Sequence, residues 1–161
     1  MTRSKAKPAT ATTATRVPGA RVKVLVAVDG SEYTKRIIDF LTSNLDIMHQ
    51  PAEFTVLHAV QKMSQHAVAV LDRSMVKRYY QEEANRIFRP IRRRFKTFGM
   101  EANFVYKVGN AAEVISGEAE SGKFNILIMG AQGAHPLKRL VMGSVVSRVM
   151  AECKVPVLLV T

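Results

Sequence analysis

Residues 22–31 read Val-Lys-Val-Leu-Val-Ala-Val-Asp-Gly-Ser. Apart from Lys23, the first seven positions are apolar and do not alternate with polar ones, which is typical of a strand covered on both faces, as in a parallel sheet. Asp29 and Gly30 end this run, and Ser31 is a favourable N-cap for a helix that follows. The stretch therefore predicts a buried parallel strand that leads directly into a helix.

The remainder of the chain alternates between the two kinds of pattern. Apolar or small residues recur at helical spacing after Ser31, whereas residues 61–74 show no clear periodicity. This alternation predicts an α/β fold with an open, parallel, five-stranded sheet and helices on both faces. The further strands are expected at 54–60, 102–108, 124–129 and 155–160, and the helices at 34–45, 75–98, 110–121 and 143–151.

Three residues mark expected irregularities in the helices. Pro90 lies inside the long helical pattern and lacks an N–H group, so we expect a kink or a break there. Asn110 and Glu113 have the spacing of a capping box, which predicts a helix start. Gly122 is expected to form the C-terminal cap of the same helix.

Composition limits the class of protein. The chain has 161 residues, one cysteine (Cys153) and a formal net charge of +11. Residues 1–20 hold no acidic residue and little to bury, so we expect a disordered basic tail before a single folded domain at 21–161. No apolar run approaches the roughly 20 residues of a membrane helix. We therefore expect a soluble, cytoplasmic protein with no membrane partner.

Glycines at the end of the fourth expected strand carry the clearest chemical signal. Gly130, Gly133 and Gly143-Ser144 form the pattern G-x2-G-x9-G-S between a strand and a helix. Glycine lets the backbone approach a ligand closely, and the free N–H groups after Gly143 form an anion site at the helix N-terminus. The pattern predicts a phosphate-binding loop, distinct from a P-loop or a dinucleotide fingerprint.

This loop resembles that of the ATP-binding universal stress proteins. The resemblance extends to residues 23–31, 55–60, 108–115 and 154–160, in the same order along the chain. It implies a Rossmann-like fold of the adenine nucleotide alpha hydrolase-like kind, with ATP as ligand and Mg²⁺ as a possible companion. The residues that it places at the nucleotide are Ala27, Val28 and Asp29 near adenine and ribose, Ala59 in the adenine pocket, Met129, Gly130 and Gly133 at ribose and phosphates, and Gly143, Ser144 and Val145 at the phosphate chain.

Some positions depart from the family pattern. Ala131, Gln132 and Val146 stand where a polar or charged side chain is common in the family, so each removes a contact to ribose or phosphate. Two readings stay open: an ATP-dependent switch or adaptor, and a nucleotide-free interaction protein of the same fold. We expect no committed catalytic residues, at most slow ATP hydrolysis, and no metal site that the sequence alone identifies.

The sequence suggests two kinds of macromolecular partner, a second copy of the chain and a nucleic acid. The resemblance implies a homodimer formed through the last strand, where Val155, Val157 and Val160 offer β-branched surface and Pro156 suits an edge. Four arginines of the long helical pattern, together with the tail, could attract RNA or DNA: Arg89, Arg92, Arg93 and Arg94. A solvated helix face is the commoner explanation of such a run, and Phe88 and Phe95 are expected to lie in the core rather than to stack on bases.

Overall fold

The computed structural model describes residues 21–44, 51–133 and 142–161. The predicted tail and residues 134–141 of the glycine loop lie outside this part. The described elements, in chain order, are β1 (Val22–Ala27), α1 (Glu32–Ser43), β2 (Ala52–Val60), α2 (Gln65–Val70), α3 (Arg73–Thr97), β3 (Ala102–Val108), α4 (Ala111–Ser121), β4 (Ile126–Gly130), α5 (Ser144–Glu152) and β5 (Val157–Val160).

The five strands form one parallel sheet with the order β3-β2-β1-β4-β5. The strand of residues 22–27 is the central one: Val24 pairs with Phe54 of β2 on one side and with Ile126 of β4 on the other. The chain adds strands in one direction from β1 to β3 and then crosses back to the other side of β1. The predicted fold class is confirmed.

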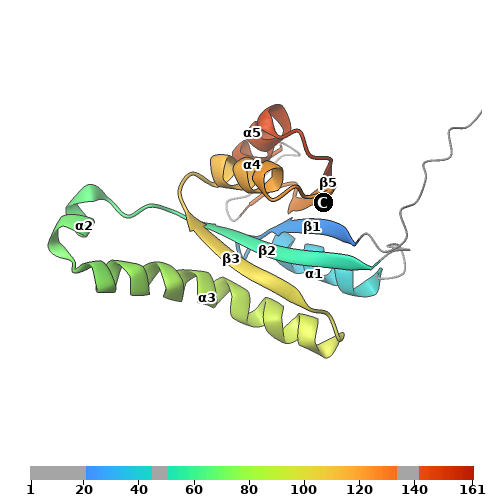
Figure 1. Ribbon diagram of the computed structural model, residues 1–161, viewed down its shortest axis with the longest axis horizontal. Coiled ribbons are helices and arrows are strands. Elements are labelled where there is room, and N and C mark those ends of the chain that lie inside the picture. Colours follow the sequence, from blue (N-terminus) through green and yellow to red (C-terminus); the bar gives the residue numbers. More distant parts are fainter. Residues whose placement is uncertain (1–20, 45–50, 134–141) are drawn as a thin grey trace, which may run out of the picture.

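Helices cover both faces of this sheet. Helices α1 and α3 pack on one face around Phe88 and Phe95, which are only 2% and 1% exposed. Helices α4 and α5 pack on the other face, where Val149 and Leu25 are fully buried. Figure 1 shows α3 along one side of the sheet, with α4 and α5 on the opposite side. Because both faces are covered, the central strands need apolar residues at every position, as the unbroken run in β1 indicates.

Pro90 does not break α3, so that part of the prediction is wrong. The helix runs as one element from Arg73 to Thr97, with Pro90 on its exposed side. The missing N–H group leaves the carbonyl of Arg86 without its helical donor. On an exposed face this carbonyl can be hydrated, and Ala84, Phe88, Ile91 and Phe95 hold both halves of the helix on the same core.

The ends of α4 confirm both predictions, because Asn110 caps the start of the helix and Gly122 is its C-terminal cap, with an N–H group that donates to the carbonyl of Glu118 (2.9 Å). The side chain of Asn110 accepts hydrogen bonds from the N–H groups of Ala112 (3.1 Å) and Glu113 (3.5 Å), as an N-cap does. Gly122 has φ −75°, whereas Lys123 has the left-handed value of 53°. Gly122 is needed for space, since a Cβ there would lie 2.4 Å from the ring of Phe124.

The region from 61 to 74, where the sequence shows no clear period, contains the short helix α2, which has no buried residue. In the part of the chain that is described, no helix is long and apolar enough to cross a membrane.

Candidate functional site

A pocket of about 530 Å³ opens at the carboxyl ends of β1 and β4. These two strands flank the point at which the strand order reverses, and open α/β sheets bind ligands at such a point. The volume lies within the roughly 300–1,000 Å³ of small-molecule sites. All ten residues that the resemblance placed at the nucleotide line this one pocket: Ala27, Val28, Asp29, Ala59, Met129, Gly130, Gly133, Gly143, Ser144 and Val145.

Other residues that line the pocket were not singled out as site residues. Three come from the first turns of α1: Tyr33, Thr34 and Ile37. Asn110 and Ala111 come from the start of α4. In the sequence, Asn110 indicated the cap of a helix and not a ligand site. The remaining lining residues are His58, Gln61, Gly109, Ile115, Gln132 and Val146.

Asp29 and Thr34 organise the turn between β1 and α1. The hydroxyl of Thr34 accepts hydrogen bonds from the N–H groups of Asp29 (3.1 Å) and Gly30 (3.0 Å). Asp29 Oδ1 in turn accepts from that hydroxyl (3.1 Å) and from the N–H group of Ser31 (3.0 Å). Ser31 occupies the N-cap position, but its side chain forms no capping bond, so this part of the prediction is corrected. The turn thus holds one carboxylate oxygen of Asp29 and leaves the other for the pocket.

The second carboxylate oxygen of Asp29 faces the glycine loop. A Cβ on Gly133 would lie 3.0 Å from Asp29 Oδ2, so the side chain and the loop are close neighbours across the pocket. A carboxylate at this place can accept a hydrogen bond from a ligand hydroxyl.

The three glycines of the motif differ in what an added Cβ would meet. A Cβ on Gly130 would lie 2.5 Å from Tyr33 Cβ, so helix α1 already fills the space beside this glycine. A Cβ on Gly143 would meet nothing closer than 3.5 Å. At Gly133 the missing Cβ keeps clear the carboxylate of Asp29. On the sequence alone, the close approach of the backbone to a phosphate explains the glycines at 130 and 133. At Gly130 the packing of α1 against the strand is by itself sufficient to explain the glycine.

Backbone hydrogen bonds hold the two ends of the loop together. The N–H group of Gly143 donates to the carbonyl of Ala131 (3.0 Å), and the N–H group of Ala131 donates to Val160 of β5 (2.9 Å). The hydroxyl of Tyr33 donates to Gln132 Oε1 (3.2 Å), which ties α1 to the same loop. These bonds occupy the Gly143 donor, so an anion would meet the N–H groups that follow it.

The N-terminus of α5 offers those donors. The helix begins at Ser144, and no side chain of the described residues caps it. The first N–H groups of a helix have no acceptor within the helix, and the helix dipole adds positive potential there. Ser144 and Val145 border the pocket, whereas Val146 is 3% exposed and its side chain belongs to the core. A phosphate group is the kind of ligand that this end of the pocket can hold.

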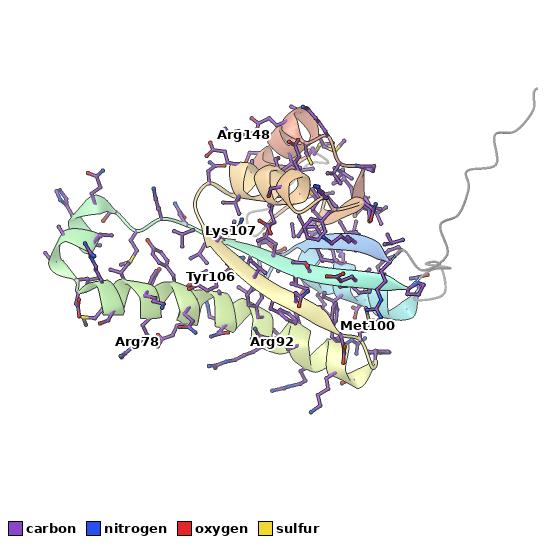
Figure 2. The ribbon with its side chains drawn as sticks, viewed as in Figure 1. Arg78, Arg92, Met100, Tyr106, Lys107 and Arg148 are labelled. Atoms are coloured by element: carbon purple, nitrogen blue, oxygen red, sulfur yellow. The ribbon has the colours of Figure 1, made fainter. Side chains whose placement is uncertain are left out.

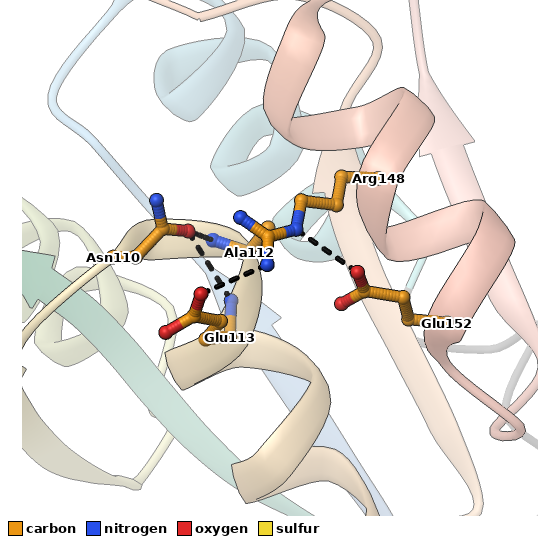
Figure 3. A network of polar contacts seen from close by, with 5 residues as sticks. All are labelled: Asn110, Ala112, Glu113, Arg148 and Glu152. Carbon is orange, nitrogen blue, oxygen red and sulfur yellow. Dashed lines mark hydrogen bonds and ion pairs between the residues drawn. The ribbon is translucent and has the colours of Figure 1, made fainter.

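A polar network joins α4 to α5 beside the pocket (Figure 3). Arg148 donates to Glu113 (2.8 Å) and to Glu152 (2.9 Å), while Asn110 caps the helix that carries Glu113. Hydrogen bonds from Arg148 to Glu152 and Glu113 raise the pKa of the guanidinium above its ordinary value. The network keeps the starts of the two helices in register at the rim of the pocket.

Part of the pocket lining is apolar. Val28, Ile37 and Ile115 line it together with Ala27 and Ala59. His58 Nδ1 lies 2.8 Å from the carbonyl oxygen of Val28, and its ring meets the edge of Phe88 with centroids 6.3 Å apart. His58 is thus a packed strand residue, as the sequence indicates, although it also borders the pocket.

Among the described residues, no group of three or more His, Cys, Asp or Glu side chains could hold a metal ion. Asp29 is the acidic side chain that lines the pocket. A divalent cation there would need phosphate oxygens and water as its further ligands.

Comparison with known proteins gives consistent matches. YxiE, a universal stress protein of Bacillus subtilis (strain 168), is 26% identical over 149 residues, which cover 86% of this chain and 97% of YxiE. The structure of hypothetical protein MJ0577 superposes with a TM-score of 0.72 at 24% identity, covering 86% of this chain and 94% of that one. A universal stress protein in complex with cAMP superposes with a TM-score of 0.64 at 22% identity, covering 89% and 99%.

The two structures share the fold of this chain. The sequence model of the universal stress protein family matches residues 21–161, which include every described strand and helix. The chain belongs to the universal stress protein family.

Proposed function

We propose that this chain binds ATP in the pocket at the ends of β1 and β4 and acts as a nucleotide-dependent switch or adaptor in a stress response. One observation carries the proposal: ten residues chosen from a sequence resemblance, spread from Ala27 to Val145, line a single pocket at the switch point of the sheet. Residues far apart in the chain converge in this way when a fold presents one ligand site.

The pocket has the two kinds of surface that a nucleotide requires. Apolar lining residues such as Val28, Ala59 and Ile115 suit a planar base, and the N-terminus of α5 suits the phosphates. Asp29 lies between the β1–α1 turn and Gly133, where its free carboxylate oxygen can accept from a ribose hydroxyl. Mg²⁺, where present, would bind mainly to the phosphates, with Asp29 within the same pocket.

The relative that was solved with cAMP carries an adenine nucleotide, which agrees with an adenine site in this family. Its ligand has a single cyclised phosphate. The choice of ATP for this chain therefore depends on the uncapped donors at Ser144 and Val145, which can serve a longer phosphate chain.

Calorimetry and thermal shift with ATP, ADP, AMP, cAMP and GTP, each with and without Mg²⁺, test the proposal. ATP at about 100 times its Kd would stabilise the folded protein by roughly 2.7 kcal/mol. The decisive variant is Ser144→Pro. Proline is favourable at the first position of a helix, and Gly143 before it already has an extended backbone (φ −61°, ψ 151°). The substitution removes the N–H group and the hydroxyl without opposing the helix.

Ser144→Ala is the matched control, since it removes the hydroxyl and keeps the N–H group. We expect Ser144→Pro to fold normally and to lose affinity for ATP more than Ser144→Ala does. No response to any nucleotide would refute the proposal. It would favour a nucleotide-free interaction protein instead, a reading that draws on the buried Val146 and the occupied Gly143 donor.

Two finer features belong to the same proposal. We propose a homodimer that pairs through β5, an edge strand of the sheet whose four residues are each partly exposed. We also propose a cytoplasmic location, in keeping with the single Cys153, which is unpaired. Light scattering that gives a monomer at high concentration would contradict the dimer.

A further inference from the structure

Helix α3 presents a line of positive charge on the side that is turned away from the sheet. Its buried side consists of Ala84, Phe88, Ile91 and Phe95, at steps of four, three and four residues. On the opposite side, at steps of three, four and three residues, lie four exposed cations, which we call the basic stripe: Arg86, Arg89, Arg93 and Lys96. Long side chains project from this side of α3 away from the sheet (Figure 2).

The stripe is not neutralised by its own surroundings. Residues 84–98 contain no Asp or Glu, and Glu82 and Glu83 bound the stripe at its N-terminal end. Arg86 pairs with Glu83 (2.8 Å) yet keeps 71% of its side chain exposed. Within the part of the chain that the structure describes, Arg89, Arg93 and Lys96 form no ion pair.

The two arginines beside the stripe are engaged elsewhere. Arg94 pairs with Asp39 of α1 (3.0 Å). Arg92 lies over the ring of Phe104 (4.5 Å to the centroid) and donates to Asn85 (3.2 Å). The Arg94–Asp39 pair joins α3 to α1, and the contact of Arg92 with Phe104 joins α3 to the edge strand β3. The helix that carries the four outer cations is therefore held in place, so a partner would not have to order its backbone.

We propose that the basic stripe binds the phosphate backbone of a nucleic-acid duplex without reading its sequence. From Arg86 to Lys96 the helix rises about 15 Å, at ~1.5 Å per residue. A duplex carries one negative charge per ~1.7 Å of its axis when both strands are counted, so a duplex segment of this length holds roughly nine phosphates, more than the four cations need. Arginine offers a planar set of donors that matches phosphate oxygens. The site is separate from the nucleotide pocket and does not depend on it.

The apolar residues argue against two other partners. A membrane-bound helix needs exposed apolar side chains beside its cations. The described exposed large hydrophobic residues of this helix region, Met75, Tyr79 and Phe98, lie outside residues 84–97. Single strands are held by stacking of bases on aromatic rings. Phe88 and Phe95 are 2% and 1% exposed and cannot stack, and the guanidinium of Arg94 already lies over the ring of the more exposed Phe98, 4.7 Å from its centroid, so a duplex is the better fit.

Fluorescence anisotropy with the full chain and a labelled DNA or RNA duplex of about 24 base pairs tests this, over roughly 50–200 mM salt. Four phosphate contacts give log K a slope of about −3.6 against log salt from the stripe alone. Replacing all four cations by Gln should reduce the slope by about that amount and weaken binding at least tenfold at low salt. Gln is a good helix former, so α3 should persist, which far-UV circular dichroism checks.

The matched control replaces four exposed lysines elsewhere by Gln, with the same loss of charge: Lys35, Lys62, Lys77 and Lys154. We expect this control to keep most of the slope. The double variant Arg89→Gln/Arg93→Gln, a smaller change to the fold, should lose about half of the stripe's contribution. Three results would overturn the proposal: no binding to a duplex at low salt, equal losses in the stripe and control variants, or binding to anionic vesicles but not to a duplex.

Discussion

Gly130→Ala should destabilise the protein without any nucleotide present. The added Cβ would lie 2.5 Å from Tyr33 Cβ, whereas carbon atoms in contact are normally about 3.5–4.0 Å apart. A Cβ atom cannot rotate away, so α1 and β4 would have to separate by about 1 Å. Overpacking of this kind costs roughly 1–3 kcal/mol. At about 3 °C for each kcal/mol in a domain of this size, Tm should fall by roughly 3–9 °C.

Thermal unfolding followed by circular dichroism measures the effect, with urea unfolding as a second reading. Gly117→Ala is the matched control, because it adds the same methyl group in α4 where no atom lies within 4 Å. Removing a helical glycine should stabilise this control by up to about 1 kcal/mol. The cost of Gly130→Ala should shrink in a Tyr33→Gly background, where the opposing Cβ is absent. An unchanged Tm, or the same cost in both backgrounds, would refute the steric reasoning.

Three other changes test the site and the core. Gly133→Ala brings a Cβ to 3.0 Å from Asp29 Oδ2, so we expect a Tm near that of the wild type. Calorimetry should give an affinity for ATP about tenfold lower, which corresponds to the weakening of one hydrogen bond. An affinity equal to that of the wild type would contradict a role for Asp29. Asn110→Ala removes the cap of α4 and should cost about 1 kcal/mol in urea unfolding, whereas Asn110→Asp, which caps as well, should cost little. Phe88→Ala empties a fully packed position and should cost about 3–5 kcal/mol, and a cost below 1 kcal/mol would place Phe88 outside the core.

The repeating patterns of the sequence were sufficient for the elements of the fold. Residues 102–108 form β3 with the predicted bounds, and Asn110 is the N-cap of α4, as the capping pattern indicates. Such patterns depend on the local chain: a strand buried on both faces is apolar throughout, and a side-chain acceptor such as that of Asn110 satisfies the free N–H groups at the start of a helix. Where neighbours intervene, the bounds move. Strand β4 begins at Ile126 rather than Phe124, and just before it the side chain of Asn125 accepts a hydrogen bond from the N–H group of Lys23 in β1.

The sequence by itself determined the α/β class, the order of the elements and, through a family resemblance, ten residues that meet at one pocket. Only the tertiary structure showed which distant residues lie against each glycine of the motif. Tyr33 explains Gly130, Asp29 lies against Gly133, and Ala131 occupies the N–H group of Gly143. These contacts join residues that are about 100 positions apart or on opposite sides of a loop. Periodicity reports only which face of a local element is buried, so it carries no information on which distant residue lies there.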